Sequence, residues 1–206
     1  MATPTIRTII FDFGNVLGFF DHQITWNKVA PHTDLTMEQM LAAIREHDLE
    51  ERYETGKMTS DEFVDTLKTV GKLRCQPEYI REAWKDIFRP NQDLCNLLPQ
   101  LRAKKYQLQL GSNTNELHAE QFLQQFEEAL DPVEHFTLSH EVGHRKPKAE
   151  FFADCHTKSG HAPQECVFID DLPANIDGAR SFGLHGIVYT GVDQLKEELK
   201  RLGVGI

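Results

Sequence analysis

Short apolar runs alternate with segments of helical periodicity along most of the chain. Five runs have the length and composition of buried strands. They are Thr8 to Phe13, Tyr106 to Leu110, Phe136 to Leu138, Cys166 to Ile169 and Gly186 to Tyr189. From the second run onward they are separated by helical segments, such as Asn115 to Phe126, Lys148 to Lys158 and Pro173 to Phe182. This alternation predicts an α/β fold, a Rossmann-like doubly wound parallel sheet with helices on both faces.

The interval between the first two runs is different, because residues 21–90 carry no strand signal. Apolar side chains recur there at helical spacing in three groups. The groups are Met37, Met40, Leu41 and Ile44; Phe63, Val64, Leu67 and Val70; and Tyr79, Ile80, Ala83, Trp84 and Ile87. Two capping-box patterns, Thr36 to Gln39 and Thr59 to Glu62, mark helix starts. We therefore predict an α/β core formed by residues 1–20 and 91–206, with an all-helical domain inserted at 21–90.

Composition limits the classes of partner. The 206 residues include 22 Lys plus Arg and 32 Asp plus Glu, giving a formal net charge of −10, and 40% are apolar. This acidic balance argues against binding to nucleic acid or to an anionic membrane, because both favour clustered cations. Residues 1–13 resemble neither a signal peptide nor a membrane span. The four cysteines form no C-x-x-C pair, which is typical of reduced thiols in a cytoplasmic protein.

Carboxylates follow two of the predicted strands. Asp12 comes after the first run, and Asp170 with Asp171 after the fourth. In an open α/β sheet, ligands bind beyond the carboxyl ends of the strands. Three carboxylates meeting there would repel one another unless a cation lay between them, and Mg²⁺ is the usual choice beside phosphate oxygens and water. The alternative is that the Asp170-Asp171 pair caps the helix that begins near Pro173.

Two further features at this edge suit an anion. Ser112 and Asn113 follow the second strand and precede a helix, so a hydroxyl, an amide and free N–H groups are available to a phosphate. Lys146 precedes Pro147, which favours an extended loop. Its ammonium could neutralise both a carboxylate and a substrate phosphate. The alternatives are a simple helix cap for Ser112-Asn113 and a solvated loop lysine for Lys146.

One motif matches a zinc-binding pattern but lacks the helical context that zinc binding requires. His140 to His144 matches H-E-x-x-H, which holds zinc when both histidines lie one turn apart on a continuous helix. Here Gly143 lies inside the match, Pro147 follows closely, and a predicted strand leads into it. We therefore predict a loop and no zinc site.

Together these residues resemble the haloacid dehalogenase-like (HAD) superfamily over nearly the whole chain. The four ordered elements of its signature correspond to Ile9 to Val16, Leu110 to Asn113, Lys146-Pro147 and Val167 to Asp171. The helical insert resembles the family's helical-bundle cap. Within it, Tyr53 to Lys57 resembles the cap loop that often faces the substrate. The Asp-x-Gly-Asn sequence of the first element resembles that of sugar-phosphate phosphatases of the glucose-1-phosphate type.

The resemblance implies a role for each candidate residue. Asp12 would be the nucleophile that forms an aspartyl-phosphate. Mg²⁺ would be held by the Asp12 carboxylate, the backbone carbonyl of Gly14 and the Asp171 carboxylate. Asp170 would position metal-bound water without binding the metal itself. The phosphoryl oxygens would bind to Ser112, the backbone of Asn113 and Lys146.

The sequence departs from the family at Gly14, where most phosphatases of the superfamily carry a second Asp that donates a proton to the leaving group. A well-placed general acid typically contributes about 10²- to 10⁴-fold. The departure argues against a mutase and leaves three interpretations. The favoured one is a Mg²⁺-dependent phosphatase of a small phosphorylated metabolite, a sugar phosphate, whose leaving group is acidic or takes its proton from water or a cap residue such as His22.

The second interpretation is a regulatory protein that keeps the phosphate site but has lost turnover. The third is a metal-free dehalogenase, whose nucleophilic Asp attacks carbon. The paired acids Asp170 and Asp171 argue against that third interpretation, because no cation is needed there.

Overall fold

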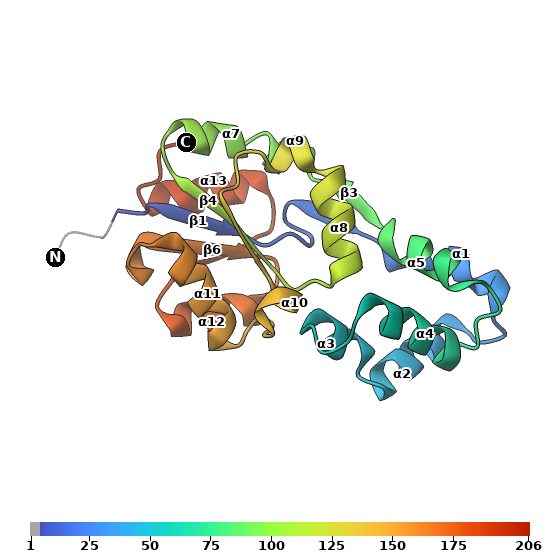
Figure 1. The fold of residues 1–206 in the computed structure, drawn as a ribbon. Helices are drawn as coiled ribbons and strands as arrows, with labels where there is room; N and C mark the ends of the chain where they lie inside the picture. The colour runs from blue at the N-terminus through green and yellow to red at the C-terminus, as the bar shows by residue number, and fades with distance from the viewer. Residues whose placement is uncertain (1–4) are drawn as a thin grey trace.

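The computed structural model describes residues 5–206, which form a parallel sheet covered by helices, with a helical cap beside it (Figure 1). The five strands are β1 (Thr8–Phe11), β4 (Gln107–Ser112), β5 (His135–Leu138), β6 (Cys166–Asp170) and β7 (His185–Val188). They lie in the order β5-β4-β1-β6-β7, and all their pairings are parallel. The predicted doubly wound α/β fold is therefore confirmed, including each of its five predicted strands.

The two faces of the sheet pack against different helices. Side chains of a strand alternate between faces. Accordingly, Ile9 and Phe11 join one apolar cluster and Ile10 joins the other. The first cluster includes residues of α6 (Gln92–Cys95), α7 (Leu98–Ala103), α8 (Glu116–Gln125), α9 (Glu127–Leu130) and α13 (Val192–Arg201). The second includes residues of α11 (Ala149–Ser159) and α12 (Pro173–Phe182). The central strand β1 is thus buried on both sides, which fixes the residues that follow it.

The cap lies to one side of the sheet and has its own apolar cluster, to which Leu117 of α8 also belongs (Figure 1). Its helices are α1 (His22–Val29), η1 (Ala30–His32), α2 (Met37–Glu46), α3 (Leu49–Glu54), α4 (Ser60–Val70) and α5 (Pro77–Lys85). Both predicted capping boxes are present, with Thr36 at the start of α2 and Thr59 at the start of α4.

The prediction that residues 21–90 lack a strand is wrong at its last three positions. Phe88–Pro90 forms β3, which pairs antiparallel with β2 (Gly18–Phe20). Each strand has three residues, of which two are exposed, so neither contains a buried run that the hydrophobic pattern would reveal. Because this ribbon lies where the chain is predicted to enter and leave the insert, the two connections run side by side.

The prediction of a loop at His140 to His144 is also incorrect in its first part. Ser139–Val142 forms the single helical turn α10, which ends at Gly143 with a φ of 80°. A glycine tolerates this left-handed conformation, and it stops the helix before His144. The continuous helix that a zinc-binding H-E-x-x-H motif needs is therefore not formed here.

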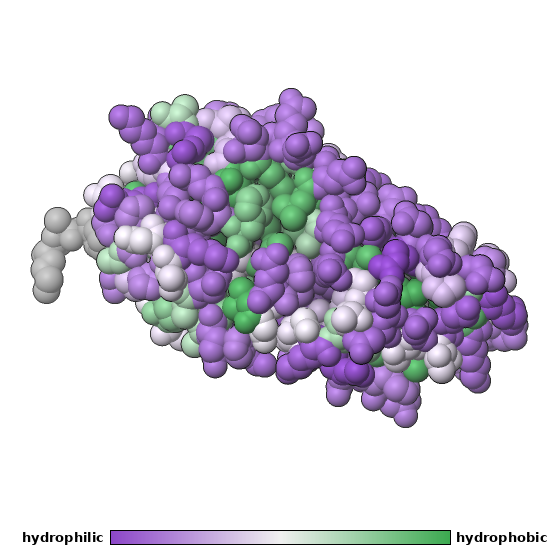
Figure 2. Space-filling model, viewed as in Figure 1, coloured by the Kyte–Doolittle hydropathy of each residue, from purple (hydrophilic) through white to green (hydrophobic). Residues whose placement is uncertain are grey.

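The surface on the side seen in Figure 2 is mostly hydrophilic, with a large hydrophobic area over the core and smaller ones elsewhere on the core and on the cap. Among residues 5–206, no helix is both long and apolar enough to span a bilayer. The prediction about the N-terminal segment rests partly on residues 1–4, which lie outside the described residues. All four cysteines are buried free thiols.

Candidate active site

Parallel pairing brings the carboxyl ends of β1, β4 and β6 to one edge of the sheet. Asp12 directly follows β1, and its N–H donates to the Ile169 carbonyl of β6 at 2.8 Å. Ser112 is the last residue of β4, and Asp170 is the last residue of β6. All three are buried, with Asp12 7% exposed. The strand-end argument therefore locates these side chains at one edge.

The Lys146 ammonium is buried between two of the predicted carboxylates. Its Nζ lies 2.7 Å from Asp12 Oδ1 and 2.7 Å from Asp170 Oδ2. It also donates to the Gly111 carbonyl at 3.0 Å. The Lys146 side chain is 1% exposed, so it is not the solvated loop lysine of the alternative interpretation. It is the cation that lets two buried carboxylates lie close together.

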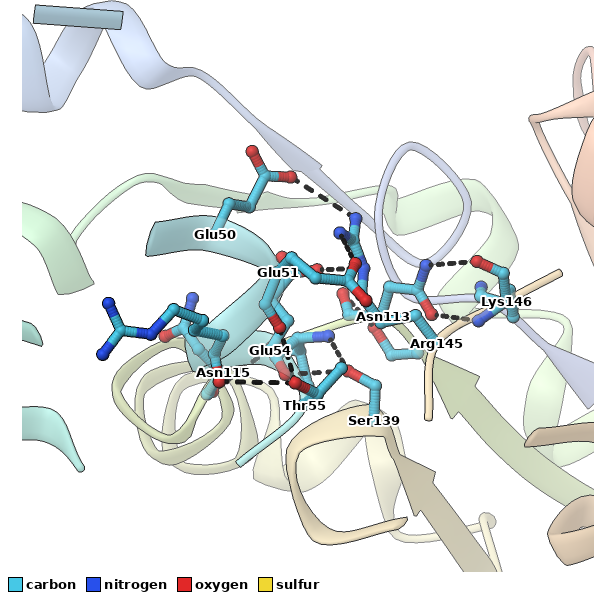
Figure 3. A network of polar contacts seen from close by, with 12 residues as sticks. Glu50, Glu51, Glu54, Thr55, Asn113, Asn115, Ser139, Arg145 and Lys146 are labelled. Carbon is cyan, nitrogen blue, oxygen red and sulfur yellow. Dashed lines mark hydrogen bonds and ion pairs between the residues drawn. The ribbon is translucent and has the colours of Figure 1, made fainter. Parts of the chain in front are cut away.

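Asn113 fixes the loop that carries this lysine. Its Oδ1 accepts from the Lys146 N–H at 2.8 Å, and its Nδ2 donates to the Lys146 carbonyl at 3.2 Å (Figure 3). The Asn113 side chain is therefore used for positioning, which leaves its backbone for a ligand. The neighbouring Ser112 hydroxyl donates to the Asn113 carbonyl at a longer 3.3 Å.

Asp170 is held from several sides. Oδ1 accepts from the N–H of Leu172 at 2.8 Å, just before α12. Asn175 Nδ2 lies 3.0 Å from both carboxylate oxygens. Asp170 thus accepts from the residue before α12 rather than from an N–H of its first turn, so the structure does not show the helix cap of the alternative interpretation.

Asp171 completes an acidic cluster. Carboxylate oxygens of Asp12, Asp170 and Asp171 lie within 4.8 Å of one another. Asp171 is half-buried, and its Oδ2 accepts from Asn15 Nδ2 at 3.1 Å. The three carboxylates carry more negative charge than the single Lys146 ammonium can offset, and all the ligand atoms are oxygens. The cluster therefore fits a hard divalent cation. Among the described residues this is the one acidic or imidazole cluster of that kind, and it excludes His140 and His144.

Burial changes the titration of the central pair. Desolvation raises the pKa of Asp12 to about 7, with a further contribution from Asp170, while the Lys146 ammonium acts in the opposite direction. Burial lowers the pKa of Lys146, but its two carboxylate neighbours raise it by more, so the net shift is upward. The lysine is therefore charged at neutral pH, and a cation beside Asp12 would favour its ionised form.

The cap contacts this edge through Arg145, the residue before Lys146. Arg145 Nη1 lies 2.9 Å from Glu51, Nε lies 2.8 Å from Glu54, and Nη2 lies 3.4 Å from Glu50 (Figure 3). All three glutamates belong to α3. Nearby, a Cβ added to Gly56 would lie 2.2 Å from the His140 carbonyl oxygen, so this turn packs directly against α10. The predicted substrate-facing loop therefore meets the core beside the site.

Sequence reasoning missed four of the side chains described above. Asn15 and Asn175 hold the acidic pair, whereas Arg145 and Glu54 join the core to the cap. Asn15 is part of the first signature element, and its φ of 54° is a conformation that Asn tolerates better than most residues. That position beside the nucleophile was the available signal. The Arg145 contacts carried none, because their partners are more than ninety residues away.

Comparisons with known proteins agree with this geometry. The model of the family described as haloacid dehalogenase-like hydrolase matches residues 6–183. The chain is 28% identical over 185 residues to D-ribitol-5-phosphate phosphatase of Bacteroides thetaiotaomicron, covering 86% of this chain and 89% of that protein.

Solved structures include a HAD family enzyme of Bacteroides thetaiotaomicron with a TM-score of 0.83 and 26% identity, over 92% of this chain and 96% of that one. A magnesium complex of that same enzyme has a TM-score of 0.78 and 25% identity, over 91% and 96% of the two chains.

Proposed function

The chain belongs to the haloacid dehalogenase-like hydrolases, and we propose that it is a Mg²⁺-dependent phosphatase acting on a small phosphorylated metabolite. The observation that carries the proposal is the buried Lys146 ammonium, 2.7 Å from Asp12, within a cluster of three carboxylates. A phosphate group brings negative charge, which the lysine and a divalent cation would offset. The curated relative named as a phosphatase supports the same reaction class.

In the proposed reaction, a carboxylate oxygen of Asp12 attacks phosphorus and the P–O bond to the alcohol breaks. This leaves an aspartyl-phosphate and the released alcohol, and water then attacks phosphorus to free phosphate and regenerate Asp12. Ser112, the Asn113 N–H and Lys146 would bind the phosphoryl oxygens. Most of the rate enhancement would come from in-line positioning and charge neutralisation.

The Asp12 carboxylate, the Gly14 carbonyl and the Asp171 carboxylate would hold the Mg²⁺. When bound, the ion would neutralise charge on the phosphoryl oxygens. Asp170 would orient Lys146 and the water around the ion, because its own oxygens already accept from Lys146, Leu172 and Asn175.

Gly14 leaves the proton donor to another group. Several titratable side chains of the cap, among them His22 and Glu54, line the same cavity as Ser112 and Asn113. Burial lowers the pKa of His22, whereas burial raises the pKa of Glu54 to about 7 against the effect of Arg145. A carboxyl group with a pKa near 7 is protonated often enough at neutral pH to act as an acid, which favours Glu54 over His22 as the donor.

The two other interpretations fit the site less well. The Asp171 carboxylate belongs to the oxygen cluster, and among the described ion pairs it has no cationic partner within 4.0 Å. A metal-free dehalogenase would have no use for such a carboxylate. A regulatory protein without turnover has no need for the buried contact between Lys146 and Asp12. The sugar-phosphate prediction is supported by the relative named for D-ribitol 5-phosphate. The reduced thiols support a cytoplasmic location.

The test is phosphate release from a panel of phosphorylated metabolites, measured with Mg²⁺ and with a chelator. We expect turnover with Mg²⁺ that is lost in the chelator and in the Asp12→Asn variant. Asp154→Asn, a change of the same kind on α11, is the matched control and should keep the wild-type rate. Turnover that persists without metal, or in Asp12→Asn, would refute the mechanism.

A further inference from the structure

A cavity of about 270 Å³ runs from the strand-end edge into the cap. Gly14, Ser112 and Asn113 line it beside Asp12, and residues of α1, α2, α4 and α5 line it within the cap. Building on the proposed phosphatase function, we propose that the substrate's alcohol carries an aromatic ring system, and that this ring system enters the cavity while the phosphate lies at Asp12. The alcohol is the part of the substrate that extends away from the nucleophile, so it must meet this lining.

The walls of the cavity are largely apolar, and aromatic rings form part of them. Rings from α1, α3, α4, α5 and β3 contribute, namely Trp26, Tyr53, Phe63, Trp84 and Phe88. The Tyr53 and Phe63 rings stack with centroids 4.3 Å apart, and Phe63 lies 4.8 Å from Trp84. Aromatic surfaces favour offset-stacked or edge-to-face contact with another ring, so an aromatic ligand matches this lining.

The Tyr53 hydroxyl and the His118 ring line the cavity and are paired within the protein, whereas the buried Trp84 Nε1 has no hydrogen-bond partner among the described residues. The Tyr53 hydroxyl lies 2.7 Å from Ser60 Oγ and accepts from the Leu117 N–H at 3.2 Å. The ring nitrogens of His118 lie 3.1 Å from Asn115 Nδ2 and 3.0 Å from the Trp84 carbonyl. A sugar chain without a ring would bury few apolar groups against this lining, so it would gain less from the cavity than the same chain carrying a ring system.

The size of the cavity suits more than a single ring. An engineered apolar cavity of about 150 Å³ is enough to bind benzene. Each methylene-sized group moved out of water contributes about fourfold in affinity. Even partial burial of a fused ring system therefore implies a preference of at least about tenfold over the same alcohol without the ring.

Two phosphate esters form a matched test pair. Ribitol 5-phosphate and flavin mononucleotide share a phosphorylated ribityl chain, and only the second carries a fused aromatic ring system. With Mg²⁺, we expect kcat/KM to be at least about tenfold higher for flavin mononucleotide, mainly through a lower KM. Equal values, or a higher value for ribitol 5-phosphate, would overturn the inference while leaving the proposed phosphatase function intact.

Variants locate the preference in the cavity. Val29→Phe and Ile44→Phe add a ring to residues that line it, whereas Val70→Phe makes the same kind of change on α4 outside the lining. Lining variants that keep the wild-type circular dichroism spectrum are folded. In these variants the ratio of kcat/KM for flavin mononucleotide to that for ribitol 5-phosphate should fall toward one. In Val70→Phe the ratio should stay at its wild-type value. A wild-type ratio in the folded lining variants would overturn the inference.

Binding separates the two proposals if neither ester is hydrolysed. In that case neither ester supports the phosphatase proposal, and flavin fluorescence of flavin mononucleotide is titrated with the Asp12→Asn protein in Mg²⁺. A dissociation constant for flavin mononucleotide at least about tenfold lower than that for ribitol 5-phosphate, measured by competition, would support the aromatic subsite. Equal constants, or no binding of flavin mononucleotide, would overturn it.

Discussion

Removal of the Asp171 carboxylate should abolish most of the stabilisation by Mg²⁺. The cluster sets three carboxylates against the one ammonium of Lys146, which leaves a formal charge of −2 (one minus three) when all are ionised. At an effective dielectric constant of about 20, two unit charges 4.8 Å apart repel by roughly 3 kcal/mol. Because Asp171 is half-buried, solvent screening reduces its share to about 1 kcal/mol.

Mg²⁺ at about a hundred times its dissociation constant would stabilise the folded protein by about 2.7 kcal/mol. In a chain of this size, 1 kcal/mol shifts Tm by about 2–4 °C, so the wild-type Tm should rise by about 5–11 °C. Asp171→Asn should be slightly more stable than wild type in a chelator, because one repulsive charge is gone. It should gain less than about 2 °C from Mg²⁺.

The assay is thermal unfolding followed by circular dichroism, with Mg²⁺ and with chelator. The exposed Asp177, on α12, offers Asp177→Asn as the matched control, and its Mg²⁺ shift should equal that of wild type. A full Mg²⁺ shift in Asp171→Asn would refute the assignment of the metal site, as would the absence of any shift in wild type.

Three further predictions concern the lysine, the nucleophile and the proton donor. Lys146→Met should lower the free energy of unfolding by about 3–5 kcal/mol in denaturant titrations, because it leaves buried carboxylates unpaired. Lys148 is half-exposed, so the control Lys148→Met should lower it by less than about 1 kcal/mol. Equal losses in the two variants would contradict the argument. Without metal, the pKa of Asp12 is raised to about 7, so its stabilising effect is present at low pH and is lost as pH rises from about 4 to about 7. Tm measured in chelator should therefore decline more steeply over that range in wild type than in Asp12→Asn, and parallel curves would be evidence against it. Glu54→Gln should lower kcat by about 10²-fold or more and remove a fall in activity above pH 7. His22→Asn should leave the pH profile of kcat unchanged. The opposite pattern would identify His22 as the proton donor to the leaving group.

The strands were predictable because each contains a short apolar run that differs from the flanking helices, and in β1, β4 and β6 that run is buried almost throughout. The hydrophobic pattern failed at Phe88–Pro90, since a three-residue strand on a two-stranded ribbon needs no apolar face. Its partner, Gly18–Phe20, lies on the other side of the cap insertion, so the pairing depends on tertiary structure.

At the site, the sequence predicted which residues follow the strands, and that was enough to bring Asp12, Lys146 and Asp170 to one edge. It did not predict which side chains hold them. The Asn113 side chain fixes Lys146 rather than a phosphate, which depends on how the loop after α10 folds back onto β4. The aromatic cavity was also beyond the hydrophobic pattern, because the periodicity of Phe63 and Trp84 fits a filled helix interface equally well.

The most direct test of the mechanism is a rapid acid quench of the enzyme during turnover of a substrate with radiolabelled phosphate, followed by peptide mapping. We predict covalent label on the peptide that contains Asp12, formed with Mg²⁺ and lost in a chase with unlabelled substrate. Phosphate release without labelled protein, or label on a peptide that lacks Asp12, would contradict an aspartyl-phosphate at this position.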